Sequence, residues 1–445
     1  YIGLIAQGEF EKALEIIRKD NPLPSICGRV CPHPCEYKCT AGEGGDPIAI
    51  RALKRFASDY GMKNKIKYPP YRKIREKDKI AIIGSGPAGL SAGYFLARRG
   101  YKVTIFESHP IPGGMLAVGI PEHRLPKNIL NYDIDNIKQA GVEIKTNVTI
   151  GKDMELDNLF KNGYKAIFIA TGAHKSMSLG CPGEEKTEDV LKSMEFLTKI
   201  NLGKEVKIGK RVGIVGGGNA AVDAARVAKR LKGVEKVTII YRRTRKEMPA
   251  YKEEVDAALA EGIDIQFLTA PNKVLSQNGR LTGIECIRME LGEMDESGRR
   301  RPVPIKGSEF AIELDTLISA IGERPDISFL KKVTGIKITK NNTIVIDKET
   351  FATNREGVFA GGDVVTGPNN VIDAISAGKI VAESIDQYIL GQSLTREYKV
   401  TRPSVYVAPV ELTEKEMAET KRPFMPSLTP KERTKSFEEV EKGFT

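Results

Sequence analysis

Cysteine is scarce in this 445-residue sequence, at 6 residues, and no apolar run reaches the roughly 18 to 20 residues that a bilayer-spanning helix needs. The start of the chain also lacks a basic segment followed by an apolar one, which is the pattern of an export signal. These absences argue against a secreted disulfide scaffold and against a membrane-spanning protein. We therefore expect a soluble, cytoplasmic protein with no membrane span.

Hydrophobic residues make up 40% of the chain and charged residues 29%, which is the balance of a globular protein with buried cores. At about 150 residues per domain, this length predicts two to four domains. The chain opens at Tyr1, inside a helical pattern, so we expect it to be a segment of a longer polypeptide.

Basic residues outnumber acidic ones by 69 to 58, and the net charge of +11 suits an acidic partner, an anionic cofactor or nucleic acid. The run Arg299–Arg301 is the best local candidate for a nucleic-acid contact. No recognition motif accompanies this run, and a solvated hairpin after Gly298 accounts for it. We expect no nucleic-acid partner.

Four of the six cysteines fall within thirteen positions, at Cys27, Cys31, Cys35 and Cys39. In a chain without an export signal, this clustering favours a reduced metal site over disulfides. The two remaining cysteines, Cys181 and Cys286, stand alone and are most simply core or surface thiols.

The order of helical and strand patterns predicts an α/β protein: two Rossmann-like dinucleotide-binding domains preceded by a small helical domain. Apolar residues at helical spacing occupy the first 62 residues, and a basic, proline-containing linker follows. We expect a helical domain at 1–62, a linker at 63–78, a first nucleotide domain at 79–204 and 323–394, a second at 205–322, and an extended C-terminal arm at 395–445.

A strand-turn-helix unit begins the first nucleotide domain. Gly84, Gly86 and Gly89 follow an apolar strand and open a helix, a spacing that permits a tight turn, a close approach of pyrophosphate and close helix–strand packing. Glu107 ends the next strand, where a carboxylate can bind ribose hydroxyls. The alternative, a glycine-rich turn without a ligand, is much less favoured.

A second unit of the same design lies about 130 residues further on, with Gly216, Gly218 and Ala221 in the turn. Its second strand ends in Arg242 and Arg243 instead of an acid. Guanidinium groups bind a 2′-phosphate that a carboxylate would repel, so this unit should prefer NADPH over NADH. A solvated basic strand end is the alternative.

Late in the chain, Gly361, Gly362 and Asp363 follow a short apolar strand and precede a helix expected at about 371–390. A carboxylate there can bind ribityl or ribose hydroxyls, and the N-terminus of the helix can face the electron-rich edge of a flavin.

Four segments together resemble the glutamate synthase small-subunit family of FAD/NADPH iron–sulfur flavoproteins: 27–36, 113–126, 241–250 and 360–363. That family includes the flavin part of dihydropyrimidine dehydrogenase and the large subunit of NADH-dependent ferredoxin:NADP oxidoreductase. The resemblance runs from residue 1 to about 395 and implies FAD on the first unit, NADPH on the second and a [4Fe-4S] cluster near the cysteines.

The resemblance also implies two sets of binding residues. The residues expected around FAD are Gly84, Gly86, Gly89, Glu107, Gly114, Met115, Arg124, Gly361 and Asp363. The residues expected at NADPH are Gly216, Gly218, Asn219, Ala221, Arg242, Arg243 and Glu247. Arg124 could equally be a loop anchor.

The cysteine segment departs from the family pattern. Relatives hold two clusters with the help of a cysteine-rich stretch upstream, and one ligand is a Gln or Glu at the position of Lys54, which cannot donate a lone pair. We therefore expect one [4Fe-4S] cluster on Cys27, Cys31, Cys35 and Cys39. Zinc is the alternative, although three-residue gaps are unusual for zinc ribbons and fingers.

The resulting expectation is an FAD-dependent NAD(P)H oxidoreductase module, in which hydride passes directly between nicotinamide and flavin and needs no obligatory acid, base or nucleophile. No two cysteines lie close in sequence between residues 80 and 390, which argues against a disulfide reductase. We expect single electrons to pass through the cluster to or from redox subunits of a larger complex, favoured as a ferredoxin-linked transhydrogenase-type complex; whether that complex bifurcates electrons is left open by the sequence. The alternatives are a glutamate synthase small subunit and a redox sensor or scaffold.

Overall fold

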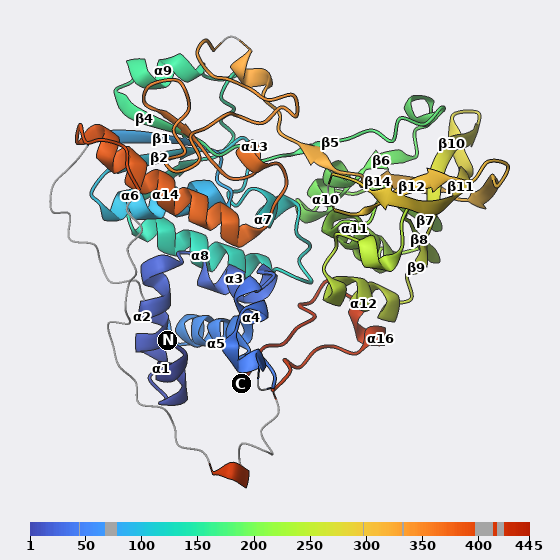
Figure 1. Cartoon of the computed structure of the whole chain (residues 1–445), viewed down its shortest axis with the longest axis horizontal. Coiled ribbons are helices and arrows are strands. Elements are labelled where there is room, and N and C mark those ends of the chain that lie inside the picture. Colours follow the sequence, from blue (N-terminus) through green and yellow to red (C-terminus); the bar gives the residue numbers. More distant parts are fainter. Residues whose placement is uncertain (44, 67–77, 297, 332, 397–412, 416–421) are drawn as a thin grey trace.

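Figure 1 shows the computed structural model of the chain, which describes residues 1–43, 45–66, 78–296, 298–331, 333–396, 413–415 and 422–445. Three bodies can be followed in the ribbon. The N-terminal helices lie below a first α/β unit, and a second α/β unit lies to the right of both (Figure 1).

The N-terminal body is helical, as its apolar spacing predicted. Its helices are α1 (Ile2–Ala6), α2 (Phe10–Asp20), α3 (Pro24–Val30), α4 (Pro34–Tyr37) and α5 (Ile50–Lys63). Ala13, Leu14 and Ile17 form the buried face of α2. A Cβ at Gly61 of α5 would lie 2.2 Å from the side chain of Leu14, so the two helices pack closely.

The first α/β unit is built on a parallel five-stranded sheet in the order β16-β4-β1-β2-β3. Its strands are β1 (Lys79–Ile83), β2 (Lys102–Phe106), β3 (Val142–Lys145), β4 (Tyr164–Ile169) and β16 (Val358–Ala360). Its helices are α6 (Pro87–Arg98), α7 (Met115–Val118), α8 (Lys127–Gln139), α9 (Leu156–Lys161), α13 (Asp363–Thr366) and α14 (Val371–Ile389). A parallel sheet is buried on both faces, which explains the almost continuous apolar character of β1 and β4.

The second α/β unit repeats this plan with the sheet order β6-β14-β7-β8-β9, also parallel. Its strands are β6 (Val190–Lys192), β7 (Arg211–Val215), β8 (Lys236–Ile240), β9 (Asp264–Gln266) and β14 (Thr316–Ser319), and its helices are α10 (Ser193–Asn201), α11 (Asn219–Arg230) and α12 (Lys252–Ala260). Because β6 pairs with β14, residues 190–201 lie in this unit, although the sequence division placed them in the first.

An antiparallel ribbon extends from the second unit. It consists of β10 (Thr269–Gln277), β11 (Arg280–Met294), β12 (Arg300–Pro304) and β13 (Phe310–Glu313). Two short strands, β5 (Lys175–Ser176) and β15 (Glu323–Arg324), pair where the chain crosses between the two α/β units.

Residues 422–445 of the C-terminal arm pack against the other bodies. It contains α16 (Pro430–Arg433), and the Glu439 carboxylate forms ion pairs with Arg29 and Arg55 of the helical body, at 2.7 and 2.9 Å. Val440 donates its backbone N–H to the carbonyl oxygen of His123, at 2.9 Å. Most of the expected linker at 63–78 and of the arm before residue 422 falls outside the described residues.

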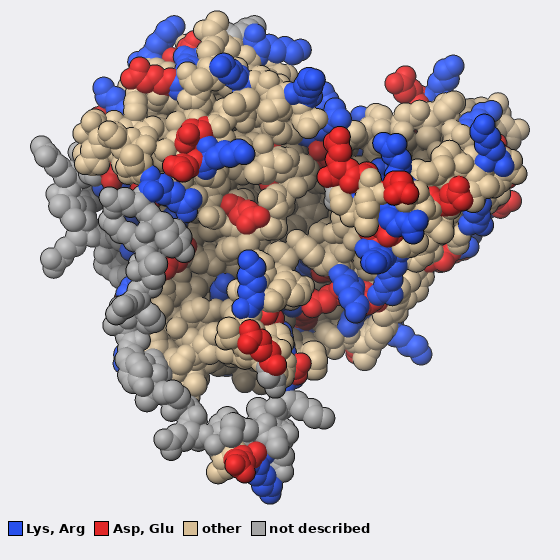
Figure 2. All heavy atoms as spheres, in the orientation of Figure 1, with Lys and Arg blue, Asp and Glu red and all other residues tan. Residues whose placement is uncertain are grey.

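Two surface properties bear on the earlier expectations. Within the described residues, no helix is long and apolar enough to cross a membrane. Figure 2 shows basic and acidic side chains interspersed over the visible face, with no broad area of one sign there.

Candidate functional site

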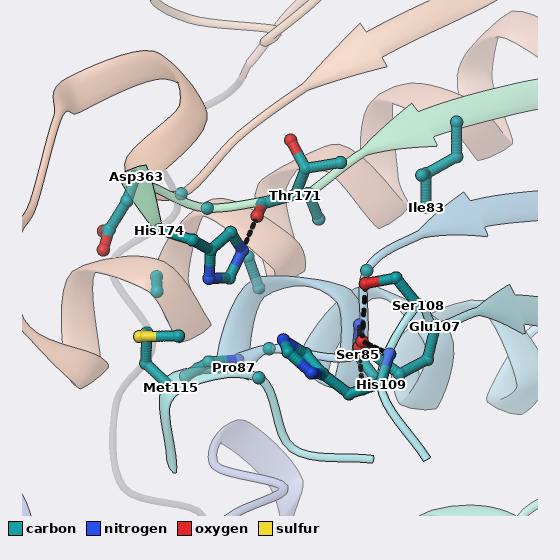
Figure 3. Close-up of a pocket in the computed structure, with 18 of the residues that line it drawn as sticks. Ile83, Ser85, Pro87, Glu107, Ser108, His109, Met115, Thr171, His174 and Asp363 are labelled. Atoms are coloured by element: carbon teal, nitrogen blue, oxygen red, sulfur yellow. Dashed lines mark hydrogen bonds between the residues drawn. The ribbon is translucent and has the colours of Figure 1, made fainter. Parts of the chain in front are cut away.

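A cavity of about 380 Å³ opens at the carboxyl edge of the first sheet. The residues that line it include the turn after β1, the end of β2 with the loop to α7, the segment after β4, and the segment from β16 to the start of α14. In Figure 3, Glu107, Ser108 and His109 lie on one side of the cavity, and Met115 and Asp363 on the other. Ligands of parallel α/β sheets bind at this edge, because the strand ends leave a crevice there.

The turn after β1 needs its glycines. Gly84 has φ +103°, and a Cβ there would lie 2.4 Å from the carbonyl oxygen of Ala170. A Cβ at Gly89 would lie 2.0 Å from the carbonyl oxygen of Gly84, whereas a Cβ at Gly86 would meet nothing within 4 Å. Gly84 and Gly89 therefore allow close packing, and Gly86 leaves room beside the N-terminus of α6 for a phosphate group.

Glu107 lies at the end of the cavity opposite Met115 and Asp363 (Figure 3). Its carboxylate is buried and accepts hydrogen bonds from the backbone N–H and hydroxyl of Ser85, at 3.0 and 2.5 Å, and from the backbone N–H of His109 at 2.8 Å (Figure 3). These bonds fix the carboxylate at the edge of the cavity, where the sequence predicted a ribose-binding acid. Its contact with a ribose stays a prediction.

The opposite wall carries Gly114, Met115, Gly361 and Asp363. A Cβ at Gly114 would lie 2.8 Å from the Cα of Gly86, so this loop lies directly against the phosphate turn. Burial raises the pKa of Asp363 to about 7. A half-buried carboxyl group that lines a cavity fits a ligand that supplies hydroxyl donors.

Two histidines at the cavity were missed by sequence reasoning. The rings of His109 and His174 meet edge to face, with centroids 6.3 Å apart. His174 contacts the carbonyl oxygen of Thr171 (Figure 3), and burial lowers the pKa of its imidazole. Each histidine lies shortly after a strand of the same sheet, and that position at the carboxyl edge could have identified both.

The second unit has an equivalent turn after β7. Gly216 has φ +148°, and a Cβ there would lie 2.2 Å from the carbonyl oxygen of Ala320. At Gly218, which precedes α11, a Cβ would meet only Pro249, at 4.0 Å, so the turn is open to a ligand. Asn219 accepts the backbone N–H of Tyr251 at 3.0 Å, and Ala221 is fully buried beneath the turn.

The basic residues after β8 divide into two kinds. Arg243 is buried, donates to the carbonyl oxygen of Arg300 at 2.7 Å and pairs with Asp295 at 2.5 Å. Arg242 is exposed, and its position at the strand end suits a 2′-phosphate. Glu247 closes a capping box with Thr244, and these bonds lower the pKa of its carboxyl group. These contacts tie Arg243 and Glu247 to the loop after β8, and their part in binding NADPH stays a prediction.

Arg124 lies outside the residues that line the cavity of the first unit. It joins the two α/β units, pairing with Asp223 of α11 at 2.7 Å and with Glu254 of α12 at 2.9 Å. These ion pairs agree with the interpretation of Arg124 as a loop anchor.

The four clustered cysteines have unpaired thiols. Burial raises the pKa of Cys27, to about 12, and that of Cys31, while Lys54 lowers both. Cys35 is exposed, and no group of three or more His, Cys, Asp or Glu side chains in the described residues is placed to hold a metal ion. The thiols have the right chemistry for iron and sulfide, but they are not gathered into a cage. Their assignment to one cluster stays a prediction.

Comparison with protein families decides the relationship. Residues 78–378 match the family model described as pyridine nucleotide-disulphide oxidoreductase. The chain belongs to this family. Residues 1–66 match a second model, described as dihydropyrimidine dehydrogenase domain II, 4Fe-4S cluster. Together these matches confirm an oxidoreductase with FAD, NADP(H) and a [4Fe-4S] cluster as cofactors. Neither Cys181 nor Cys286 is among the described residues that line the cavity.

Curated relatives confirm the predicted resemblance. The glutamate synthase [NADPH] small chain of Halomonas elongata is 35% identical over 87% of this chain and 85% of its own length. The beta subunits of the NADP(+)-dependent formate dehydrogenase of Moorella thermoacetica and the NADPH-Fe(3+) oxidoreductase of Geobacter sulfurreducens are each 45% identical over 87% of this chain. The chain spans 58% and 61% of the lengths of those two relatives.

Solved structures support the fold. Mycobacterium tuberculosis FprA in complex with NADPH aligns with a TM-score of 0.60 and 18% identity, covering 71% of this chain and 85% of FprA. Thioredoxin reductase of T. acidophilum aligns with a TM-score of 0.53 and 24% identity, covering 71% of this chain and 99% of that enzyme. The expected α/β fold with two nucleotide units is confirmed.

Proposed function

We propose that this chain is the NADPH-linked FAD and iron–sulfur module of a larger, cytoplasmic redox complex. In this proposal the first α/β unit holds FAD through Gly84, Gly86, Glu107, Gly114, Met115, Gly361 and Asp363, and the second holds NADPH through Gly216, Gly218 and Arg242. The flavin, when bound, exchanges a hydride with nicotinamide and single electrons with an iron–sulfur cluster.

The observation that carries the proposal is the position of Met115, which lies in the wall of the cavity between the two α/β units. Met115 lines the cavity and packs against the apolar cores of both α/β units. Its neighbour Leu116 also lines the cavity and belongs to the large core that the first α/β unit shares with the helical body, where Cys27 and Cys31 are buried. A flavin in this cavity would therefore lie next to the second α/β unit.

The residues of the chain serve this function by binding and by excluding water. Ile83, Phe106 and Leu116 give the cavity apolar walls, which favour a flat aromatic ring and disfavour water around it. No acid or base is assigned a catalytic role, since hydride transfer needs the two rings held together in a dry site.

The partner is the finer part of the proposal. The formate dehydrogenase and Fe(3+) oxidoreductase beta subunits are more similar to this chain, at 45% identity, than the glutamate synthase small chain, at 35%. This difference supports a partner subunit like those of the two beta subunits over a glutamate-forming one. A ferredoxin-linked complex stays a prediction.

An anaerobic titration of the FAD-loaded protein with NADPH and with NADH, followed by flavin absorbance, tests the proposal. We expect NADPH to bleach the flavin much faster than NADH, and analysis of the protein to find iron and sulfide. Flavin that NADPH fails to reduce would favour the sensor or scaffold alternative. Zinc in place of iron would contradict the proposed electron transfer, because zinc does not change its oxidation state.

A further inference from the structure

The basic run Arg299–Arg301, which had no function at the sequence level, lies beside the proposed NADPH site. It begins at the turn between β11 and β12, where the backbone of Asp295 donates to the carbonyl oxygen of Arg299 at 2.8 Å. The backbone N–H of Arg299 donates back to the Asp295 carboxylate at 3.3 Å. These two bonds fix the backbone of Arg299 at the base of the turn.

Arg243 holds this turn against the end of β8. Its guanidinium contacts the residues on both sides of Arg299 in the turn, with Nη2 2.5 Å from the Asp295 carboxylate and Nε 2.7 Å from the carbonyl oxygen of Arg300. Arg243 itself is buried. A substitution there would release the turn, so Arg243 is a positioning residue for the hairpin.

The result is that three cations, Arg242, Arg243 and Arg299, gather at the end of β8. Arg242 adjoins Arg243 in sequence and is exposed at the strand end. Partial burial of the guanidinium lowers the pKa of Arg242, and the neighbouring charges of Arg243 and Arg299 lower it further. The Asp295 carboxylate lies beside this group and pairs with Arg243. Guanidinium groups that repel one another in this way are stabilised when an anion binds between them.

We propose that Arg299 binds the 2′-phosphate of NADPH together with Arg242, so that the inserted hairpin determines the preference for NADPH over NADH. This inference rests on the proposed function, because it assigns the ligand of the same site. Two guanidinium groups from separate elements can contact different oxygens of one phosphate, whereas the 2′-hydroxyl of NADH offers them no charge.

Calorimetric binding of adenosine 2′,5′-bisphosphate and of 5′-AMP to the FAD-loaded protein tests the proposal without any redox turnover. Arg299→Gln should raise the Kd for the bisphosphate about tenfold, which is the effect of losing one charge-assisted hydrogen bond. The Kd for 5′-AMP should stay unchanged. Arg299→Lys should restore part of the loss. Lys306→Gln removes a cation from the same ribbon, outside the turn, and should change neither ligand.

Salt separates a direct contact from a distant field. The Debye length falls to about 3 Å at 1 M salt, so a loss caused by a direct contact persists there and a loss caused only by the field disappears. The assignment would be overturned if Arg299→Gln reduced the affinity for the bisphosphate no more than Lys306→Gln does. It would also be overturned if the loss of affinity occurred only at low salt. A wild-type protein that binds the bisphosphate no better than 5′-AMP would instead refute the proposed NADPH preference itself.

Discussion

The ion pairs of Arg124 should hold the two α/β units together, and replacing Arg124 by Met tests this. Arg124 donates to both carboxylate oxygens of Asp223, at 2.7 and 2.9 Å, and pairs with Glu254 at 2.9 Å. The side chains of Arg124 and Asp223 are only 11% and 7% exposed. Without Arg124, Glu254 keeps its pairing with Arg226 at 2.5 Å, but Asp223 loses its hydrogen-bonded partner.

A buried charge that loses its partner costs about 3 to 5 kcal/mol, so we expect a loss of that size in the free energy of unfolding at pH 8. Urea denaturation followed by circular dichroism and flavin release measures it. Lys138→Met is the control, because Lys138 forms an exposed pair with Asp135 and should cost no more than about 1 kcal/mol.

The pH dependence of Arg124→Met gives a second test. Burial raises the pKa of Asp223 in the folded protein, and Arg124 is the main group that lowers it. In the variant the folded pKa should rise further above the unfolded value of about 4, so stability falls as the pH rises past 4. The variant should therefore be less impaired at pH 5 than at pH 8. A loss equal to that of Lys138→Met, or one independent of pH, would show that this contact does not hold the units together.

Three further predictions concern the nucleotide sites. Arg242→Gln should raise the KM for NADPH about tenfold or more and leave the KM for NADH unchanged, as steady-state kinetics with both nucleotides would reveal. Gly216→Ala should abolish flavin reduction by NADPH while FAD stays bound, because the new Cβ would lie 2.2 Å from the carbonyl oxygen of Ala320; normal reduction by this variant would contradict the assignment of the turn. In the FAD-free protein, the raised pKa of Asp363, about 7, should make stability fall as the pH rises from about 4 to 7, and Asp363→Asn should remove this part of the pH profile in denaturation experiments.

The sequence predicted most of the architecture, because its signals are local. A glycine with positive φ after an apolar strand, as at Gly84 and Gly216, leaves few alternatives to a turn into a helix. The two units, the family and the cofactor set all follow from such short segments. The boundary at 190–201 was misplaced because β6 is three residues long and its pairing with β14 spans more than 120 positions of sequence.

The roles of individual charged residues depended on the tertiary structure. Arg242 and Arg243 are adjacent and chemically identical, yet only contact with the β11–β12 turn buries Arg243 and leaves Arg242 exposed. Arg124 could serve the flavin or anchor a loop until Asp223 and Glu254 were found beside it. A sequence specifies which groups can carry charge, but their partners come from distant segments, and it is these partners that decide whether a charge binds a ligand or holds the fold.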